Sequence, residues 1–379
     1  TEPDYIYISH IHEDHYDPKF LHKLFDKYGV KPILIPDSKH NYLLHIGKSD
    51  GLILTPTRYL DLGHTELFIE EDATDSISDV DSTLIVHDKI NNKTFLNLND
   101  CIYNESHVNK LQKILKKFTN HIDLVGMVYT SAGPFPQTYF DLKSDKYALL
   151  EAADNRKNKC FDLYVRYAES FPSEYRLPFA GDYILGGKLT ELNEYRGSAD
   201  AFEVTKFDNK ALVFNAGGYV DLLNNKITGL RKSMHSLNDL NKRLKEISKN
   251  KLDYEIDFNI KIKKINFLRL LTKSSKNAQI KSEINGEYYF VFSITENDVI
   301  KERYFVGVSD SKITKLSLDE EIRLNYYSEI IIDFRLLFGL LTSVYHWNNA
   351  EGGSLFNTRR HPVENYQKPV HSYLNFFVI

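Results

Sequence analysis

The sequence predicts a mixed α/β protein: a four-layer αββα sandwich followed by an α+β extension. Two observations lead to this prediction. Over the first 224 residues, apolar runs of strand length alternate with helical segments, and polar residues gather where the strands end. Near residue 225 the composition changes, and a stretch rich in Lys, Asn and Leu begins. We therefore expect a first domain over 1–224 and an α+β extension over 225–379 that packs on it.

Several elements follow from local patterns. Strand–turn–strand signals cover 82–98, and 104–119 carries apolar residues on one helical face with lysines on the other. Beyond residue 225, the pattern predicts that 226–251 is helical. It then predicts a second sheet over about 252–315, where 254–258 alternates like a strand, and a helical segment over 316–344.

Composition and charge narrow the class of partner. A net charge of −4 gives no electrostatic reason to expect nucleic acid or membrane binding. Two cysteines, Cys101 and Cys160, cannot build a disulfide framework or a Cys-rich zinc module. No apolar stretch approaches the length of a transmembrane helix. We expect a cytoplasmic protein that acts on a small molecule.

The densest group of chemically active side chains lies between residues 9 and 18. The apolar run 5–8 precedes it and predicts a short buried strand. Asp17 and Pro18 follow as the N-cap and the first position of a helix that continues to about Tyr28. The group therefore lies on a tight strand-to-helix loop, where neighbouring side chains can converge on one point.

Four residues of this loop are candidate metal ligands: His10, His12, Asp14 and His15. Imidazole and carboxylate together suit zinc, iron or manganese, whereas calcium prefers oxygen ligands alone. The alternative is a solvated, His-rich loop. The H-x-H-x-D-H spacing, between a strand and a capped helix, favours a site for one or two iron or zinc ions.

Asp100 is a further candidate, because it follows the apolar strand that ends near residue 98. Its carboxylate could ligate a metal and, like that of Asp14, orient a catalytic water. The alternative is an Asx turn or a helix cap.

Two later loops supply candidates for substrate binding. Asp182 lies in the Gly- and Pro-containing loop 178–183, where tight turn geometry is the simpler explanation. Arg359 and Arg360 follow a glycine turn and could clamp a carboxylate or phosphate, with surface salt bridges as the alternative.

The loop at 10–15 resembles the metal motif of the metallo-β-lactamase superfamily. That resemblance implies the αββα fold, with the first two histidines on one metal, the Asp-His pair on a second, and Asp100 as the bridging acid. The superfamily also supplies a histidine at a position that corresponds to 75–81, where this chain has none. Asp75 or Asp79 could substitute for it; otherwise one metal position would be weak or empty.

Five segments resemble CMP-N-acetylneuraminate hydroxylases more closely: 7–15, 95–101, 131–140, 178–183 and 347–362. The resemblance implies non-haem iron, O₂-dependent hydroxylation of a CMP-linked sialic acid, and electrons from a Rieske [2Fe–2S] centre. A Rieske centre needs paired Cys and His ligands that this chain does not encode. We therefore expect either a Rieske module upstream of residue 1 or a separate electron-transfer partner.

Three functions are consistent with these residues. The first is an iron-dependent oxygenase acting on a nucleotide sugar or sugar acid, as the resemblance implies. The second is a metal-dependent hydrolase, such as a lactonase or phosphodiesterase, in which the metal activates water. The third is a non-enzymatic binding module whose metal site has decayed, which the absent histidine would explain.

Overall fold

The computed structural model describes residues 2–39, 41–72, 80–179, 181, 183–282, 284, 286–324, 326–363 and 373–379. The chain forms two compact units. Unit 1 comprises Thr1–Ser131, Arg156–Asp182 and Ser198–His235, and unit 2 comprises Ala132–Asn155, Tyr183–Gly197 and Ser236–Ile379. The units interleave along the chain, whereas the predicted domains meet at a single boundary after residue 224. That boundary stays a prediction.

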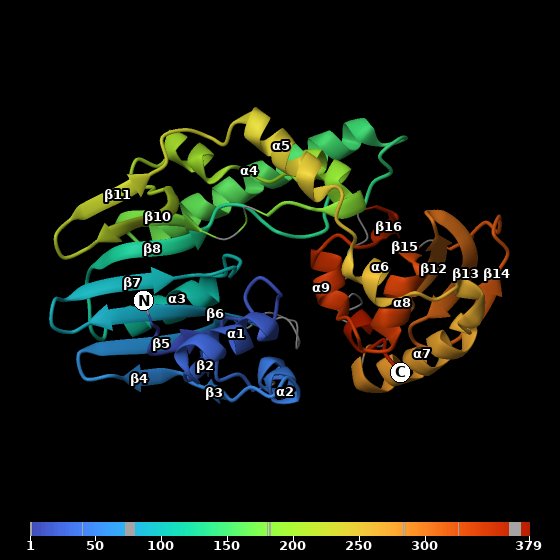
Figure 1. The fold of residues 1–379 in the computed structure, drawn as a ribbon, viewed down its shortest axis with the longest axis horizontal. Coiled ribbons are helices and arrows are strands. Elements are labelled where there is room, and N and C mark those ends of the chain that lie inside the picture. The colour runs from blue at the N-terminus through green and yellow to red at the C-terminus, as the bar shows by residue number, and fades with distance from the viewer. Residues whose placement is uncertain are drawn as a thin grey trace. The chain divides into compact units, whose positions relative to one another are not determined.

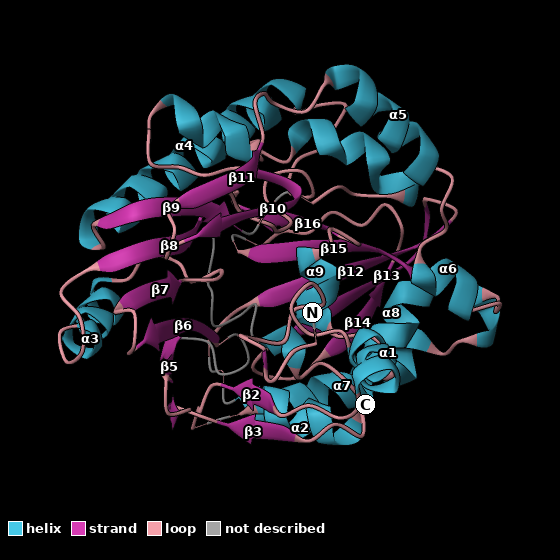
Figure 2. Ribbon diagram, turned by 60° about the vertical axis from the view of Figure 1, so that its left-hand side comes forward, coloured by secondary structure: helices cyan, strands magenta, loops and turns pink. Residues whose placement is uncertain are grey.

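The first sheet of unit 1 is small and parallel, with the order β1-β2-β3. Its elements, in chain order, are β1 (Ile6–Tyr7), α1 (Pro18–Tyr28), β2 (Ile33–Ile35), α2 (Tyr42–Ser49) and β3 (Leu54–Pro56). Leu21 of α1 and Leu43 of α2 pack with Ile33 and Leu54 in one apolar core. The helix α2 lies beside β3 (Figure 2). Gly47 allows this close approach, because a Cβ there would collide with the side chain of Leu54. The predicted helix to Tyr28 is confirmed. The strand predicted at 5–8 is present but shorter, as Ile6–Tyr7, and it is half-buried rather than buried.

The second sheet of unit 1 follows the chain order from β4 to β9 (Figure 1). Its strands are β4 (Tyr59–Asp61), β5 (Thr65–Asp72), β6 (Asp81–Asp88), β7 (Lys93–Asn97), β8 (Ile122–Val128) and β9 (Ser173–Phe179). Strands β4 to β7 pair antiparallel, and β7, β8 and β9 pair parallel. Leu96 and Val125 of this sheet are completely buried.

Two helices complete the core of this sheet. They are α3 (Glu105–Leu115) and the C-terminal part of α4 (Lys146–Ser170). Leu111 of α3 and Tyr164 of α4 share one apolar core with Leu96. Unit 1 therefore has two sheets that pack with helices, in addition to the two-stranded sheet of β10 (Phe214–Asp221) and β11 (Lys226–Leu230). This agrees with the mixed α/β sandwich predicted for it.

Contrary to the prediction, the segment 226–251 is not a single helix. Strand β11 (Lys226–Leu230) pairs with β10 (Phe214–Asp221), and the helix α5 (Leu237–Ile247) begins only after Ser236. Asn225 has a positive φ of 50°, and the carboxylate of Asp221 accepts backbone N–H bonds from the turn, so local turn chemistry starts a hairpin there. The Ser236 side chain caps α5.

Unit 2 is built on a sheet with the order β14-β13-β12-β15-β16. Its strands are β12 (Tyr289–Glu296), β13 (Val299–Gly307), β14 (Ile313–Leu316), β15 (Tyr327–Asp333) and β16 (Asn357–His361). Its helices include α6 (Asp253–Asp257), α7 (Phe267–Ser282), α8 (Phe334–Leu341) and α9 (Trp347–Gly352), with the 3-10 segments η1 (Gly187–Tyr195) and η3 (Ile262–Lys264); η2 (Ala201–Lys206) belongs to unit 1. No helix in the described part of the chain is long and apolar enough to cross a membrane.

Two predictions for unit 2 are wrong. Residues 254–258 form most of the short helix α6 and not a strand, because Glu255 caps its start at the backbone of Leu252 while Tyr254 is buried. The apolar stretch within 316–344 contains the buried strand β15 before the helix α8, and Asp333 caps that helix. A continuous apolar run does not distinguish a central strand from a buried helix.

Candidate metal centre

The His-rich loop connects β1 to α1, as predicted. Asp17 accepts a hydrogen bond from the backbone N–H of Phe20 at 2.9 Å and begins α1. The backbone N–H groups of His15 and Tyr16 both donate to the carbonyl of His12, at 2.9 and 2.8 Å. The chain therefore turns within the motif, so that side chains from both ends of it lie together.

Ser9 orients two of the three histidines. Its Oγ lies 2.9 Å from Nδ1 of His10 and 3.0 Å from Nδ1 of His15. On the other side of its ring, Nε2 of His10 lies 2.7 Å from Nδ1 of His12. Three imidazoles therefore converge, two of them held from behind by one buried hydroxyl.

Asp100 completes the group from the loop that follows β7. Its Oδ2 lies 3.5 Å from Nε2 of His15, and ligand atoms of His10, His15 and Asp100 all lie within 4.8 Å of one another. Oδ1 of Asp100 is buried and has no hydrogen-bond partner among the described residues. Buried oxygens are nearly always satisfied by a hydrogen bond or an ion.

The electrostatics of the group agree with a cation site. Burial raises the pKa of Asp100, but the contact with His15 and the charges of His15, His10 and His12 outweigh it, so that the net pKa is lowered. Asp100 is therefore an anion beside imidazole nitrogens. Imidazole nitrogens with a carboxylate fit iron or zinc, and the unsatisfied Oδ1 is an observation of this structure that an ion would explain.

Asp14 lies at the edge of the group. Its Oδ2 is 3.7 Å from Nε2 of His15, but its side chain is 66% exposed and lies outside the tight set of ligand atoms. Its roles as metal ligand and catalytic carboxylate stay predictions.

Asp81, the first residue of β6, is a site residue that sequence reasoning missed. Its Oδ1 lies 3.3 Å from Nδ1 of His10, and its side chain is 12% exposed. A carboxylate in this position favours the tautomer with hydrogen on Nδ1, which leaves the lone pair of Nε2 facing the other histidines. Asp75 and Asp79, the predicted substitutes for a histidine, lie outside the described residues. The signal for Asp81 was its place at the start of a predicted strand.

Of the predicted substrate-binding residues, Arg359 and Arg360 belong to unit 2. Asp182 lies outside the described residues. In unit 2, Nη2 of Arg359 lies 2.6 Å from Oδ2 of Asp141, and the guanidinium of Arg360 lies 4.2 Å from the ring centre of Tyr139. Arg359 is thus already paired with a carboxylate. The anion-binding roles of both arginines stay predictions.

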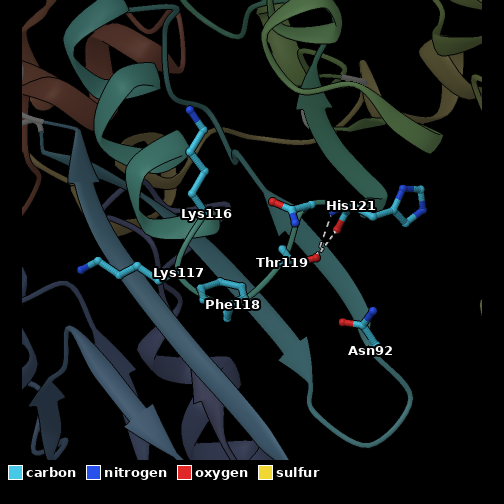
Figure 3. A pocket seen from close by; sticks show the side chains of 7 residues that line it. Asn92, Lys116, Lys117, Phe118, Thr119 and His121 are labelled. Carbon is cyan, nitrogen blue, oxygen red and sulfur yellow. Dashed lines mark hydrogen bonds between the residues drawn. The ribbon is translucent and has the colours of Figure 1, made fainter.

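A separate pocket lies where β7 and β8 begin, lined by Asn92 and residues 116–121 (Figure 3). Thr119 fixes this turn: its Oγ1 donates to the carbonyl of His121 and accepts from the His121 N–H. Asp100 follows the other end of β7. The pocket is therefore distinct from the candidate metal centre.

No protein-family model and no curated protein matches the chain. Similar solved structures include metallo-β-lactamase-fold proteins. The metallo-β-lactamase fold protein YhfI from Bacillus subtilis is 15% identical, with a TM-score of 0.27. The match covers 47% of this chain and 66% of YhfI, which is just under two thirds of its length. Isothiocyanate hydrolase from Delia radicum gut bacteria is 14% identical over 56% and 74% (TM-score 0.33), and human tRNase Z, short form, is 12% identical over 46% and 71% (TM-score 0.29). Likeness at this level supports no particular substrate, and the resemblance to CMP-N-acetylneuraminate hydroxylases gains no support from it.

Proposed function

We propose that unit 1 is a metal-dependent enzyme whose ion is held by His10, His12, His15 and Asp100, with Asp14 at the open side. The observation that carries this proposal is the buried, unsatisfied Oδ1 of Asp100 beside converging imidazoles. When bound, the ion would supply Lewis acidity for hydrolysis or, if it is iron, the redox chemistry of an oxygenase.

The residues of this chain would divide the remaining work. Ser9 and Asp81 hold the imidazoles in position from behind, so that little rearrangement is needed when the ion binds. Asp14 is the exposed carboxylate beside His15, so it can reach a substrate or a water molecule and take up a proton.

The finer proposal is oxygenation of a nucleotide sugar or sugar acid, with a CMP-sugar as the first substrate to test. The sequence segments that resemble CMP-N-acetylneuraminate hydroxylases support it. It requires electrons from a Rieske centre that this chain does not provide, because Cys101 and Cys160 are its only cysteines.

A second candidate is hydrolysis of a lactone or phosphodiester. One observation favours it: hydrolysis needs only the ion, water and a carboxylate base, all of which this site could supply without an electron donor.

Metal analysis of protein purified without oxygen tests the shared proposal. We expect close to one equivalent of iron or zinc at this site, and the double variant His12→Ala with Asp14→Ala should lose that equivalent. A variant with unchanged metal content would contradict the ligand assignment.

Turnover then separates the two chemistries. Hydroxylation of a CMP-linked N-acetyl sugar in the presence of O₂ and an added reductant supports the oxygenase, whereas cleavage of chromogenic phosphodiesters or lactones supports the hydrolase. Stoichiometric zinc without iron would overturn the oxygenase. A site that holds no ion would overturn both and favour a binding module.

A further inference from the structure

Beyond the candidate metal centre, two more groups of His, Cys, Asp or Glu lie close enough to share an ion in the described part of the chain. In the first group, His121, Asp123 and Glu174, the ammonium of Lys93 lies 2.8 Å from Asp123 and already neutralises it. The second group is Asp72, Cys101 and His107, which we name the buried triad. All three of its members are at most 3% exposed.

Three different elements bring the buried triad together. Asp72 ends β5, Cys101 follows β7, and His107 lies in the first turn of α3. The oxygen, sulfur and nitrogen atoms that they offer lie within 4.8 Å of one another. Zinc–ligand bonds of 2.0–2.3 Å place the ligands of a tetrahedral site about 3.5 Å apart, so only small side-chain shifts would close the triad on an ion.

His107 is the observation that points to a ligand. Neither of its ring nitrogens has a hydrogen-bond partner among the described residues. Burial, followed by the charge of Lys110, lowers the pKa of His107 to about 4, so the ring is neutral at pH 7. The backbone of Glu70 acts in the opposite direction and raises the pKa of His107, although its contact with the ring does not have the geometry of a hydrogen bond. Neutral imidazole is the form that binds metals, and an unsatisfied buried imidazole is costly.

An ordinary ion pair explains the triad less well. Nδ1 of His107 lies 3.8 Å from Oδ1 of Asp72, which is longer than a hydrogen bond, and a neutral imidazole brings no charge to the pair. An ion pair also gives no role to Cys101, whose sulfur lies in the same group.

We propose that the buried triad is a second metal site, which holds zinc through the carboxylate of Asp72, the sulfur of Cys101 and the imidazole of His107. Thiolate, imidazole and carboxylate are all zinc ligands. Binding releases the thiol proton of Cys101 to solvent and forms the metal–sulfur bond, with no change of oxidation state. The ion would tie β5, the loop after β7 and α3 together.

An ion in the buried triad would also help to hold the candidate metal centre in place. Asp100 and Cys101 are neighbours in the chain, so one peptide would link the two ions. The phenol of Tyr167 donates to the carbonyl of Cys101 at 3.0 Å and holds this stretch of backbone. The proposal does not depend on which reaction unit 1 catalyses.

Cobalt(II) loading of the full chain tests the proposal, because only a cobalt–thiolate bond gives an intense charge-transfer band in the near ultraviolet. We expect the band in the wild type and its loss in Cys101→Ser, whereas the matched control Cys160→Ser keeps it. The double variant His12→Ala with Asp14→Ala should also keep it, although it loses the other equivalent of metal. That result separates this site from the first.

His107→Gln supplies an independent measurement. Its metal content should fall by one equivalent of zinc while circular dichroism shows that the chain still folds. A wild type without the band, or a folded His107→Gln variant with unchanged zinc content, would overturn the buried triad as a metal site.

Discussion

At the scale of single residues, the candidate metal centre depends on groups behind the ligands as much as on the ligands. Ser9 contacts two imidazoles, and Asp81 contacts the outer nitrogen of His10. Such contacts set the tautomer and the direction of a ligand before an ion arrives. The affinity of the site should therefore respond to a residue that never touches the ion.

Asp81→Asn tests this. Asparagine keeps the size of the side chain but removes the charge that favours hydrogen on Nδ1 of His10, so the affinity for zinc should fall about 10- to 100-fold. Competition with a chromogenic chelator measures it. Asp88→Asn is the matched control, since Asp88 lies at the other end of the same strand and caps an exposed turn. Equal affinities in the two variants would show that Asp81 does not act through His10.

At the scale of elements, α1 fixes where the His-rich loop ends. Asp17→Ala removes the side chain that accepts the N–H of Phe20 and should reduce the free energy of unfolding by about 1 kcal/mol. Urea titration measures the loss. Lys19→Ala, on the exposed side of the same turn, should leave stability unchanged. A similar loss in both variants would mean that the cap contributes nothing specific.

The helix α3 depends on its buried face. Leu111 is completely buried in the core that it shares with Leu96, so Leu111→Ala should cost about 2–5 kcal/mol of the free energy of unfolding. Chemical denaturation followed by circular dichroism provides the measurement. Lys113→Ala is exposed and should change stability by less than about 0.5 kcal/mol. A small loss for Leu111→Ala would contradict this packing of α3.

At the scale of the whole molecule, the two units have separate apolar cores. The core of unit 2 contains Trp347, the only tryptophan of the chain, which is 2% exposed and donates from its indole N–H to the carbonyl of Phe377 at 3.1 Å. The two cores of unit 1 lie around its three-stranded and six-stranded sheets. All proposed metal ligands belong to unit 1. Tryptophan emission therefore reports on the unit that has none of them.

Zinc should consequently stabilise one unit only. At a free concentration about 100 times its dissociation constant, it should add about 2.7 kcal/mol to the stability of unit 1. Hydrogen exchange in peptides from β7 and α3 should slow on adding zinc and recover on chelation, while the urea midpoint from Trp347 emission stays constant. An equal shift of both signals would show that the two units unfold together.

The sequence alone determined the local parts of this protein. The strand before His10, the cap at Asp17, the helix to Tyr28 and the strand that leads to Asp100 all follow from contacts between residues near one another in the chain. Periodicity, capping and ligand spacing express such contacts directly. The mixed α/β class followed from the same patterns.

Only the tertiary structure decided which distant residues meet. Asp81 reaches His10 across more than 70 residues, and Asp72, Cys101 and His107 come from three separate elements. No local pattern marks such pairs, because strand pairing and helix packing bring them together. The same reason explains the error at β15 in unit 2. Its apolar run suits a helix as well as a strand, and it forms a strand because it is buried between β12 and β16 in the sheet.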